Sequence, residues 1–354
     1  MTHAPFRWSV VLTRLLHGEH LEEELAAEVM GSLMRGEAEH AQVAALLTAL
    51  RAKGEAPAEV AGFVRAMLAE AEPIELDQHV VDRLVDTCGT GGDGANTFNI
   101  STVAAVVTAA AGQPVAKHGN RAASGVCGSA DLLEAWGVAI ELPPAGVARC
   151  VRELGIGFLY ARSFHPAMRH VAPVRAQLGI RTAFNVLGPL SNPAGAPHQV
   201  VGVSDARLAP VMAEALRRLG KRHALVFRGD DGLDELTTTG PSHVWEVREH
   251  RVDEWVLDPG ELGIARSKPA DLQGGDVADN VAIADAVLAG QPGAPTDIVV
   301  LNAAAALYAA DAVDDLAAGV ARAREALASG AARELRDRWV KRSKELAQEP
   351  RTHG

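Results

Sequence analysis

The chain has 354 residues, of which 48% are hydrophobic and 4% aromatic, and it carries a formal net charge of −11. A chain of this length can bury a substantial core and predicts two domains, or one large domain with a smaller neighbour. The acidic balance argues against nucleic-acid binding, which needs a basic surface, and no apolar run approaches the roughly 20 residues that cross a bilayer. We therefore expect neither a nucleic-acid partner nor a membrane partner.

The three cysteines, Cys88, Cys127 and Cys150, lack the spacing of metal ligands and cannot all pair with one another. Free thiols of this kind are typical of a reducing compartment. The N-terminus also lacks the pattern of a signal peptide. A cytoplasmic location is the expectation that follows.

Residues 8 to 71 are predicted to be helical throughout. Val60, Val64 and Met67 recur at spacings of three and four residues, which places them in one apolar stripe along a helix. Gly36 and Gly54 follow such runs and mark their ends. Residues 1–75 should form a small helical domain that packs against the rest of the chain and carries no chemistry of its own.

From residue 84 onward, strand-like and helix-like runs alternate. The predicted strands are Val115–Lys117, Ile156–Ala161, Gln199–Val203, Ala224–Phe227, Val244–Val247 and Ile298–Leu301. The predicted helices are Asp131–Trp136, Gly146–Leu154, Ala206–Leu219, Val277–Leu288, Leu316–Leu327 and a charged, solvent-facing tail over Arg333–Gln348. The alternation predicts an α/β fold, in which residues 76–165 and 191–354 form a central mixed sheet flanked by helices. Segment 166–190 interrupts the alternation and is expected to return to the helical domain.

A glycine-rich stretch, Gly89-Thr90-Gly91-Gly92-Asp93-Gly94, precedes the first helix of the α/β region. Glycine adopts positive φ without steric cost, so several backbone N–H groups of this loop can point into one hollow. No Asp or Glu occurs from Gly94 through Ala130, whereas Lys117, His118 and Arg121 do. A stretch without acids in an acidic chain, placed before a helix N-terminus, predicts a phosphate site.

The same glycines match the G-x-G-x-x-G pattern of dinucleotide-binding proteins. That site needs an acidic residue about 20 positions later for the ribose, and the next carboxylate here is Asp131. No Gly-Lys-Ser/Thr follows, so the stretch is not a P-loop either. Both absences argue against a dehydrogenase and a P-loop NTPase.

Seven blocks together resemble the anthranilate phosphoribosyltransferase family, from about residue 10 to about residue 345. They are the GTGGDG loop, Asn99–Thr102, Lys117–Arg121 with Gly128–Asp131, His165–Met168, Arg175 with Leu178–Thr182, Asn185–Leu190 and Gly232–Glu235. The resemblance implies transfer of a phosphoribosyl group to anthranilate, the second step of tryptophan biosynthesis from chorismate. It also implies a homodimer whose small helical domain caps the cleft and supplies the dimer surface.

The resemblance implies three groups of site residues. Those for phosphoribosyl diphosphate are Gly89, Gly92, Asp93, Thr97, Asn99, Ile100, Ser101, Thr102, Lys117, His118, Gly119, Asn120, Arg121, Ala122, Ala123, Ser124, Gly125 and Ser129. Those for anthranilate are Gly89, His118, Asn120, His165, Arg175 and Gly188. The ligands of a Mg²⁺ cofactor would be Ser101, Asp234 and Glu235. No residue is expected to act as a covalent nucleophile.

The residue types suit these roles, although each has a simpler interpretation. Backbone amides, hydroxyls and Lys117 can hold phosphates, or the first loop could be only a tight turn with helix caps. Asp234 and Glu235 would face opposite sides of a regular strand, so Gly232 should break the strand and let both carboxylates face one Mg²⁺ site. Without the resemblance, the pair would be interpreted as a solvated acidic turn. Arg175 can form a bidentate pair of hydrogen bonds with a carboxylate, or it could be a surface charge on a helix.

The chain departs from the family pattern at two places. Gly125 replaces a usual serine, and Tyr160-Ala161-Arg162 replaces a usual Phe-Ala-Pro, which puts one phosphate contact and the rim of the acceptor pocket in question. Two alternatives stay open: a pyrimidine nucleoside phosphorylase-like enzyme and an inactive nucleic-acid-binding paralogue. The first has a further C-terminal domain and needs no Asp-Glu pair, and the second needs a basic surface.

Overall fold

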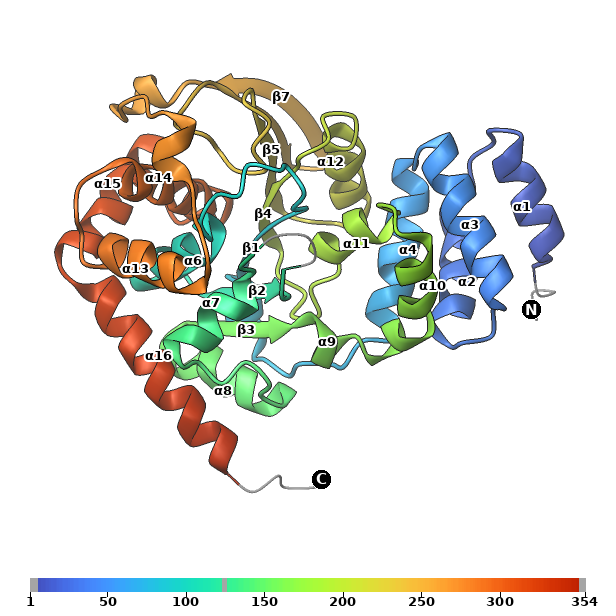
Figure 1. Ribbon diagram of the computed structural model, residues 1–354, viewed down its shortest axis with the longest axis horizontal. Helices are drawn as coiled ribbons and strands as arrows, with labels where there is room; N and C mark the ends of the chain where they lie inside the picture. Colours follow the sequence, from blue (N-terminus) through green and yellow to red (C-terminus); the bar gives the residue numbers. More distant parts are fainter. Residues whose placement is uncertain (1–5, 123–125, 350–354) are drawn as a thin grey trace.

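The computed structural model describes residues 6–122 and 126–349, and its first part is a helical bundle (Figure 1). The four helices are α1 (Trp8–Leu16), α2 (Glu23–Met34), α3 (His40–Lys53) and α4 (Pro57–Ala69). Val60, Val64 and Met67 are buried, as their spacing predicts. Helices α2 and α4 approach closely at Gly62, where a Cβ atom would lie 2.2 Å from the carbonyl oxygen of Glu23. The helical prediction for this region is confirmed.

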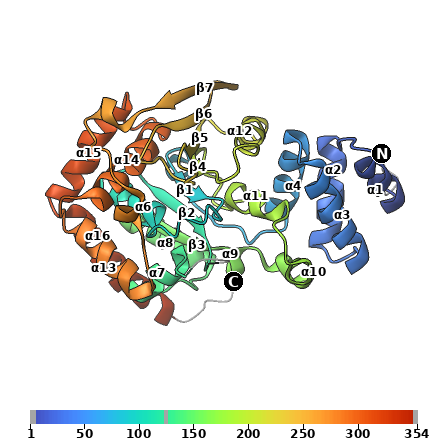
Figure 2. The same cartoon turned by 45° about the horizontal axis from the view of Figure 1, so that its top comes forward.

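Segment 166–190 lies against this bundle. It contains a 3₁₀ turn, η1 (Pro166–His170), and the helices α10 (Ala172–Leu178) and α11 (Phe184–Leu190). Helix α10 contacts α3 and α11 contacts α4, and both views show α11 between α4 and the sheet (Figure 2). The division of the chain into two domains stays a prediction, because one apolar core runs from the bundle onto a face of the sheet.

A seven-stranded mixed sheet forms the centre of the larger part, in the order β3-β2-β1-β4-β5-β6-β7. The strands are β1 (Val85–Gly89), β2 (Val115–Gly119), β3 (Ile156–Tyr160), β4 (His198–Gly202), β5 (His223–Gly229), β6 (Ser242–Arg248) and β7 (Arg251–Leu257). Strands β3, β2, β1, β4 and β5 are parallel, and β6 and β7 continue the sheet as an antiparallel hairpin. The predicted α/β class with a central mixed sheet is confirmed.

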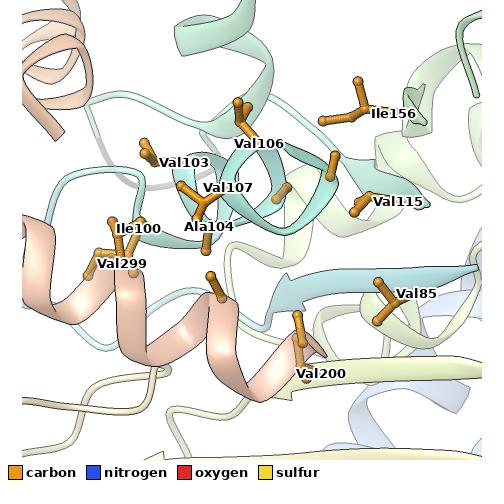
Figure 3. Close-up of a cluster of buried hydrophobic side chains, with 14 of the residues drawn as sticks. Val85, Ile100, Val103, Ala104, Val106, Val107, Val115, Ile156, Val200 and Val299 are labelled. Carbon is orange, nitrogen blue, oxygen red and sulfur yellow. The ribbon is translucent and has the colours of Figure 1, made fainter. Parts of the chain in front are cut away.

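Helices cover both faces of the sheet because its central strands are apolar on both sides. In β5, Leu225 and Phe227 face the core beneath α6 (Ile100–Ala110) and α14 (Ala294–Ala309). Ala224 and Val226 face the other core, which α12 (Ala209–Arg218) shares with the helical bundle. Figure 3 shows the first core, where side chains of α6 meet those of α14 and of the neighbouring strands. This two-sided burial is typical of parallel sheets.

The remaining elements surround the first core. They are α5 (Gln78–Val81), α7 (Ser129–Trp136), α8 (Pro144–Leu154), α9 (Ala161–Phe164), α13 (Val277–Leu288), α15 (Leu316–Ala328), α16 (Ala331–Gln348) and the 3₁₀ turns η2 (Pro259–Leu262) and η3 (Pro269–Leu272). Within the described ranges, no helix combines the length and apolarity that crossing a membrane requires.

Three sequence-based expectations differ from the structure. The predicted strand at 298–301 lies inside α14, because a short apolar run does not distinguish a strand from a fully buried helix. The tail helix α16 is not only a solvated face, since it packs on α6 and α8 and buries Trp339 to 2% exposure. Strands β1 and β7 are absent from the predicted strands. Strand β1 contains the charged residue Asp86, which is buried, so its sequence does not form an apolar run. Strand β7 is largely exposed and contains several charged residues, so it lacks an apolar run as well.

Candidate active site

A cavity of about 990 Å³ opens at the carboxyl ends of β1, β2 and β3, and Asp234 and Glu235 of the loop after β5 also line it. The strand order reverses between β1 and β4, so loops leaving these two strands diverge and leave a crevice, the usual ligand site of such sheets. Segment 166–190 forms the opposite wall, and Figure 1 shows β3 pointing towards it. The cavity therefore lies between the sheet and the helical bundle.

Most residues that the sequence singles out line this one cavity. They are Gly89, Gly92, Asp93, Thr97, Asn99, Ile100, Ser101, Lys117, His118, Gly119, Asn120, Arg121, Ala122, Ser129, His165, Arg175, Gly188, Asp234 and Glu235. Thr102 does not line it: its side chain is buried on α6, and its hydroxyl has no hydrogen-bond partner in the described chain. Ala123, Ser124 and Gly125 lie outside the described residues. Stretches far apart in sequence thus meet at one place.

The loop after β1 is shaped by glycines and tied to both walls. Gly91 and Gly92 have φ values of +66° and +78°, which favour glycine. The Gly91 amide donates to Oδ2 of Asp234 at 2.6 Å, and the Arg181 guanidinium donates to the Gly91 carbonyl at 3.0 Å. A Cβ atom on Gly92 would lie 1.4 Å from Nη1 of Arg181. The loop conformation thus requires glycine, and Arg181 holds the loop to segment 166–190.

Helix α6 begins directly behind the loop, as the sequence predicts. Asn99 precedes the helix, and its amide group donates to Oδ1 of Asn280 at 3.0 Å and to the Cys127 carbonyl at 3.1 Å. The Ser101 amide, one of the unpaired donors of the first helical turn, donates to Oε1 of Glu235 at 3.2 Å. The N-terminus of α6 therefore points towards the side of the cavity where Asp234 and Glu235 lie.

Lys117 is a buried cation at the floor of the cavity, only 2% exposed. Its Nζ donates to the Thr87 carbonyl and to Oγ of Ser101, the second at 3.2 Å. Burial lowers its pKa, and the nearby Asp86 carboxylate opposes that shift. Since one of its donors points at Ser101, the ammonium polarises a hydroxyl that faces the cavity.

Two carboxylates, Asp234 and Glu235, line the cavity from the loop after β5. Burial, and next the charge of Asp93, raises the pKa of Asp234 to about 6. Burial and the neighbouring Asp234 raise the pKa of Glu235 as well. The backbone of this pair lies so close to β4 that a Cβ atom on Gly202 would lie 1.6 Å from the Asp234 carbonyl oxygen. Two like charges forced together out of water are stabilised by a cation.

In the described chain no cluster of three or more acidic, histidine or cysteine side chains could enclose a metal ion. Mg²⁺ usually takes one or two carboxylates and completes its shell with water and substrate phosphates. The Asp234-Glu235 pair, which lies beside the glycine-rich loop, matches that coordination pattern. The residues present therefore suit a Mg²⁺ ion that arrives with a phosphorylated substrate.

Arg175 lies on the opposite wall with its guanidinium 5.1 Å from the centre of the Phe184 ring. It makes no ion pair and no side-chain hydrogen bond to any other described residue. Burial lowers its pKa, although an arginine stays charged at any ordinary pH. A partly dehydrated, unpaired guanidinium at a cavity wall is suited to a carboxylate ligand.

Two histidines lie beside this wall with ring centres 5.1 Å apart. Nδ1 of His118 lies 3.2 Å from the Gly188 carbonyl, so Nδ1 carries the proton and Nε2 is the acceptor. That Nε2 is buried and has no partner in the described chain. Burial, and next the proximity of His165, lowers the pKa of His118 to about 3, so the ring is neutral at pH 7. Burial lowers the pKa of His165 too.

Sequence reasoning assigned no role to three further arginines at the cavity, namely Arg162, Arg169 and Arg181. A signal for them exists. No Asp or Glu occurs between Glu153 and Asp205, and that stretch carries all three arginines in addition to Arg175. It repeats the pattern of the first acid-free stretch, so each of the two stretches brings cationic side chains to the cavity.

Comparisons with known proteins show the family of the chain. The family described as "Glycosyl transferase family, a/b domain" matches residues 81–333, and "Glycosyl transferase family, helical bundle domain" matches residues 9–71. The anthranilate phosphoribosyltransferase of Roseiflexus castenholzii is 56% identical over 330 residues, or 93% of this chain and 95% of the relative. The crystal structure of the Thermus thermophilus enzyme of that name matches with a TM-score of 0.89 and 49% identity, over 94% of this chain and 99% of that one. The Saccharomyces cerevisiae enzyme in complex with PRPP and Mg matches with a TM-score of 0.86 and 26% identity, over 96% and 98%.

Proposed function

The chain belongs to the anthranilate phosphoribosyltransferases of the glycosyl transferase family, and we infer that it makes N-(5-phosphoribosyl)anthranilate. It transfers the phosphoribosyl group of 5-phospho-α-D-ribose 1-diphosphate to the amine of anthranilate and releases diphosphate, with Mg²⁺ as cofactor. This is the second step of tryptophan biosynthesis from chorismate. The identity of the relatives leaves no support for a nucleoside phosphorylase or an inactive nucleic-acid-binding paralogue.

The observation that carries the assignment of the site is the placement of opposite chemistries on two walls of one cavity. The glycine loop and the Asp234-Glu235 pair occupy the wall at the strand ends, whereas the unpaired Arg175 faces them from segment 166–190. A donor with a diphosphate suits the first wall, and an acceptor with a carboxylate suits the second. The reacting carbon and nitrogen would then meet between the walls.

On the donor side, the bond between C1 of the ribose and the diphosphate oxygen breaks, and the diphosphate leaves with the electron pair. Bound Mg²⁺ would neutralise negative charge on the diphosphate, and Asp234, Glu235 and Ser101 are the residues that would hold it. The Gly91 and Ser101 amides already donate to Asp234 and Glu235, so the phosphate oxygens would use the other amides of the glycine loop and the positive end of α6. These donors are fixed before the substrate arrives, so they stabilise the leaving group without rearrangement.

On the acceptor side, Arg175 would orient anthranilate through its carboxylate so that the amine faces C1. A neutral His118 whose Nε2 lacks a donor within the described chain can accept a hydrogen bond from the amine N–H. The new C–N bond forms as the diphosphate leaves, and the proton that the amine loses passes to the solvent, since His118, with a pKa of about 3, does not retain it at pH 7. Positioning two bound substrates can supply much of the rate enhancement, so no covalent nucleophile is needed.

The decisive experiment follows the fluorescence of anthranilate in the presence of purified protein. Loss of the signal that requires both phosphoribosyl diphosphate and Mg²⁺, with formation of diphosphate in equal amount, is the expected result. A reaction mixture lacking the donor is the control. Phosphorolysis of a pyrimidine nucleoside with no consumption of anthranilate would refute the proposal.

We also propose that the chain works as a homodimer in the cytoplasm. Helix α1 exposes Leu16 to 75% and Val10 to 48%, apolar surface that a second copy of the chain could cover. The cysteines Cys88, Cys127 and Cys150 are all free, as in a reducing compartment. Sedimentation equilibrium of the wild type and of Leu16→Glu tests the dimer. A monomeric wild type would refute it.

A further inference from the structure

A second cavity, of about 320 Å³, adjoins the first at segment 166–190. Its wall combines Arg51 and Glu55 of the α3–α4 region, Thr182 and Val186 of segment 166–190, and Arg228 of β5. The segment after β4 adds Ser204, Asp205, Ala206 and Leu208. Only Arg181 and Asn185 line both cavities. The volume is at the lower end of the range of small-molecule pockets, about 300–1,000 Å³. The second cavity is thus a separate space between the helical bundle and the sheet.

Glu55 is the most unusual group in the second cavity. The residue is only 7% exposed, yet its carboxylate makes no ion pair and no hydrogen bond to another residue of the described chain. Burial raises its pKa, and the charge of Arg51 opposes that shift. The carboxylate hydrogen-bonds to its own backbone amide and to no other described residue, so it can accept a further donor from a ligand.

Three arginines line the same cavity as this carboxylate: Arg51, Arg181 and Arg228. None of them makes an ion pair within the described residues; Arg228 donates to the backbone carbonyls of Ser204 at 3.1 Å and Gly229 at 3.3 Å. The other acid at the wall, Asp205, is already paired with Arg207 at 2.7 Å. The second cavity therefore offers an excess of positive charge around one carboxylate.

A ligand that pairs with these side chains must bring an anionic group to the guanidiniums and a hydrogen-bond donor to Glu55. An amino carboxylate carries both on a small framework. Arginine recognises a carboxylate through paired N–H donors, and an amine or ammonium can donate to Glu55. Thr182, whose buried hydroxyl has no partner in the described chain, offers a further polar contact at the wall.

Arg181 connects the second cavity to the donor loop. Its guanidinium donates to the carbonyls of Gly91 at 3.0 Å and Thr90 at 3.4 Å, and the Gly91 amide donates to Asp234. Ser204, at the wall of the second cavity, also donates to the Gly91 carbonyl at 2.9 Å. A carboxylate in the second cavity would compete with these carbonyls for Arg181. We propose that the second cavity binds a small amino carboxylate and that its occupancy weakens binding of the donor substrate.

Two sources share this chemistry, namely anthranilate itself and free α-amino acids. Calorimetric titration of the intact protein, without donor substrate, distinguishes them. The probes are anthranilate and each of the standard L-amino acids in turn. Arg51→Ala and Glu55→Gln remove one contact each, and Arg338→Ala, an exposed arginine on α16 that lines neither cavity, is the matched control.

We expect an L-amino acid to bind once, or anthranilate to bind twice, and Arg51→Ala to weaken that binding event about ten-fold or more, as loss of a charged hydrogen bond does. Glu55→Gln should weaken it too, whereas Arg338→Ala should not. Absence of any binding event beyond one anthranilate, or equal binding by all three variants, would overturn the site. These results do not depend on the transferase activity.

Activity assays then test the link to the donor loop, which rests on the proposed function. The bound probe should raise the KM for phosphoribosyl diphosphate in the wild type and in Arg338→Ala. It should do so much less in Arg51→Ala, whose KM without the probe should be unchanged. Because coupling between binding sites is reciprocal, the donor should in turn weaken binding of the probe in the calorimetric titration. A probe that binds the second cavity and leaves the donor KM unchanged would overturn the link.

Discussion

Replacing Arg175 by alanine should damage anthranilate binding and leave the donor substrate almost unaffected. The guanidinium lies at the acceptor wall, has no acidic partner in the described chain and is partly dehydrated, so it is free to hold a carboxylate. A charged hydrogen bond is worth about 1.5–3 kcal/mol, which corresponds to roughly 10- to 150-fold in the KM for anthranilate or in kcat/KM.

The cost to folding should be much smaller. Arg175 contributes its contact with the Phe184 ring at 5.1 Å and no ion pair with another described residue, and a partly exposed cation–π contact is worth about 0.5–1 kcal/mol. Lysine at this position keeps the charge but loses the planar pair of donors, so Arg175→Lys should recover only part of the activity.

The assay measures the KM for each substrate from the loss of anthranilate fluorescence, with Arg338→Ala as a control for removal of an arginine charge elsewhere. Thermal unfolding of each variant shows whether the fold is intact. An Arg175→Ala enzyme with unchanged anthranilate KM and kcat would refute the assignment. An equal rise in both KM values would also refute it, because the acceptor wall would then not be specific for the acceptor.

Three further predictions concern the metal, pH and the tail helix. Asp234→Ala and Glu235→Ala should each lower activity and raise the Mg²⁺ concentration needed for half of the remaining rate; variants with wild-type Mg²⁺ dependence would remove the pair from the metal site. Burial acts to raise the pKa of Glu246, but hydrogen bonds, first that from His223 at 3.0 Å, outweigh it and lower the pKa below the ordinary 4.5. A lowered pKa stabilises the fold above pH 4.5, and this stability is lost as the pH falls below that value, so the Tm should fall less steeply there in Glu246→Gln than in the wild type; parallel pH profiles would contradict this. Trp339→Ala should lower the free energy of unfolding by about 3–5 kcal/mol through a cavity beneath α16, measured by denaturant titration, and a change below about 1 kcal/mol would show that the helix is not part of the core.

The local periodicities of the sequence were sufficient to predict the class of the fold and most of its helices and strands. Helix α13 begins and ends where the pattern predicts, because its caps and apolar spacing are local properties. Local pattern failed where burial is complete or where a strand lies at an edge. The run 298–301 is β-branched and apolar but belongs to a helix buried on every side, and β7 forms through a two-residue turn at Glu249 and His250 with positive φ, which lacks the usual Asn-Gly signal.

The chemistry of the site divides in the same way. Composition and order along the chain were enough to identify the glycine loop, the acid-free stretch and, through resemblance, the Asp234-Glu235 pair and Arg175. The sequence by itself does not show that Lys117 is buried and bonded to Ser101, or that Arg181 ties the loop to the opposite wall. Nor does it show that Glu55 is buried at a second cavity and forms no ion pair with the described residues. Each of these depends on which loops meet when the strands pair and the helical bundle closes over the sheet. Burial, pairing and pKa shifts are properties of contacts between residues distant in sequence, so only the tertiary structure decides them.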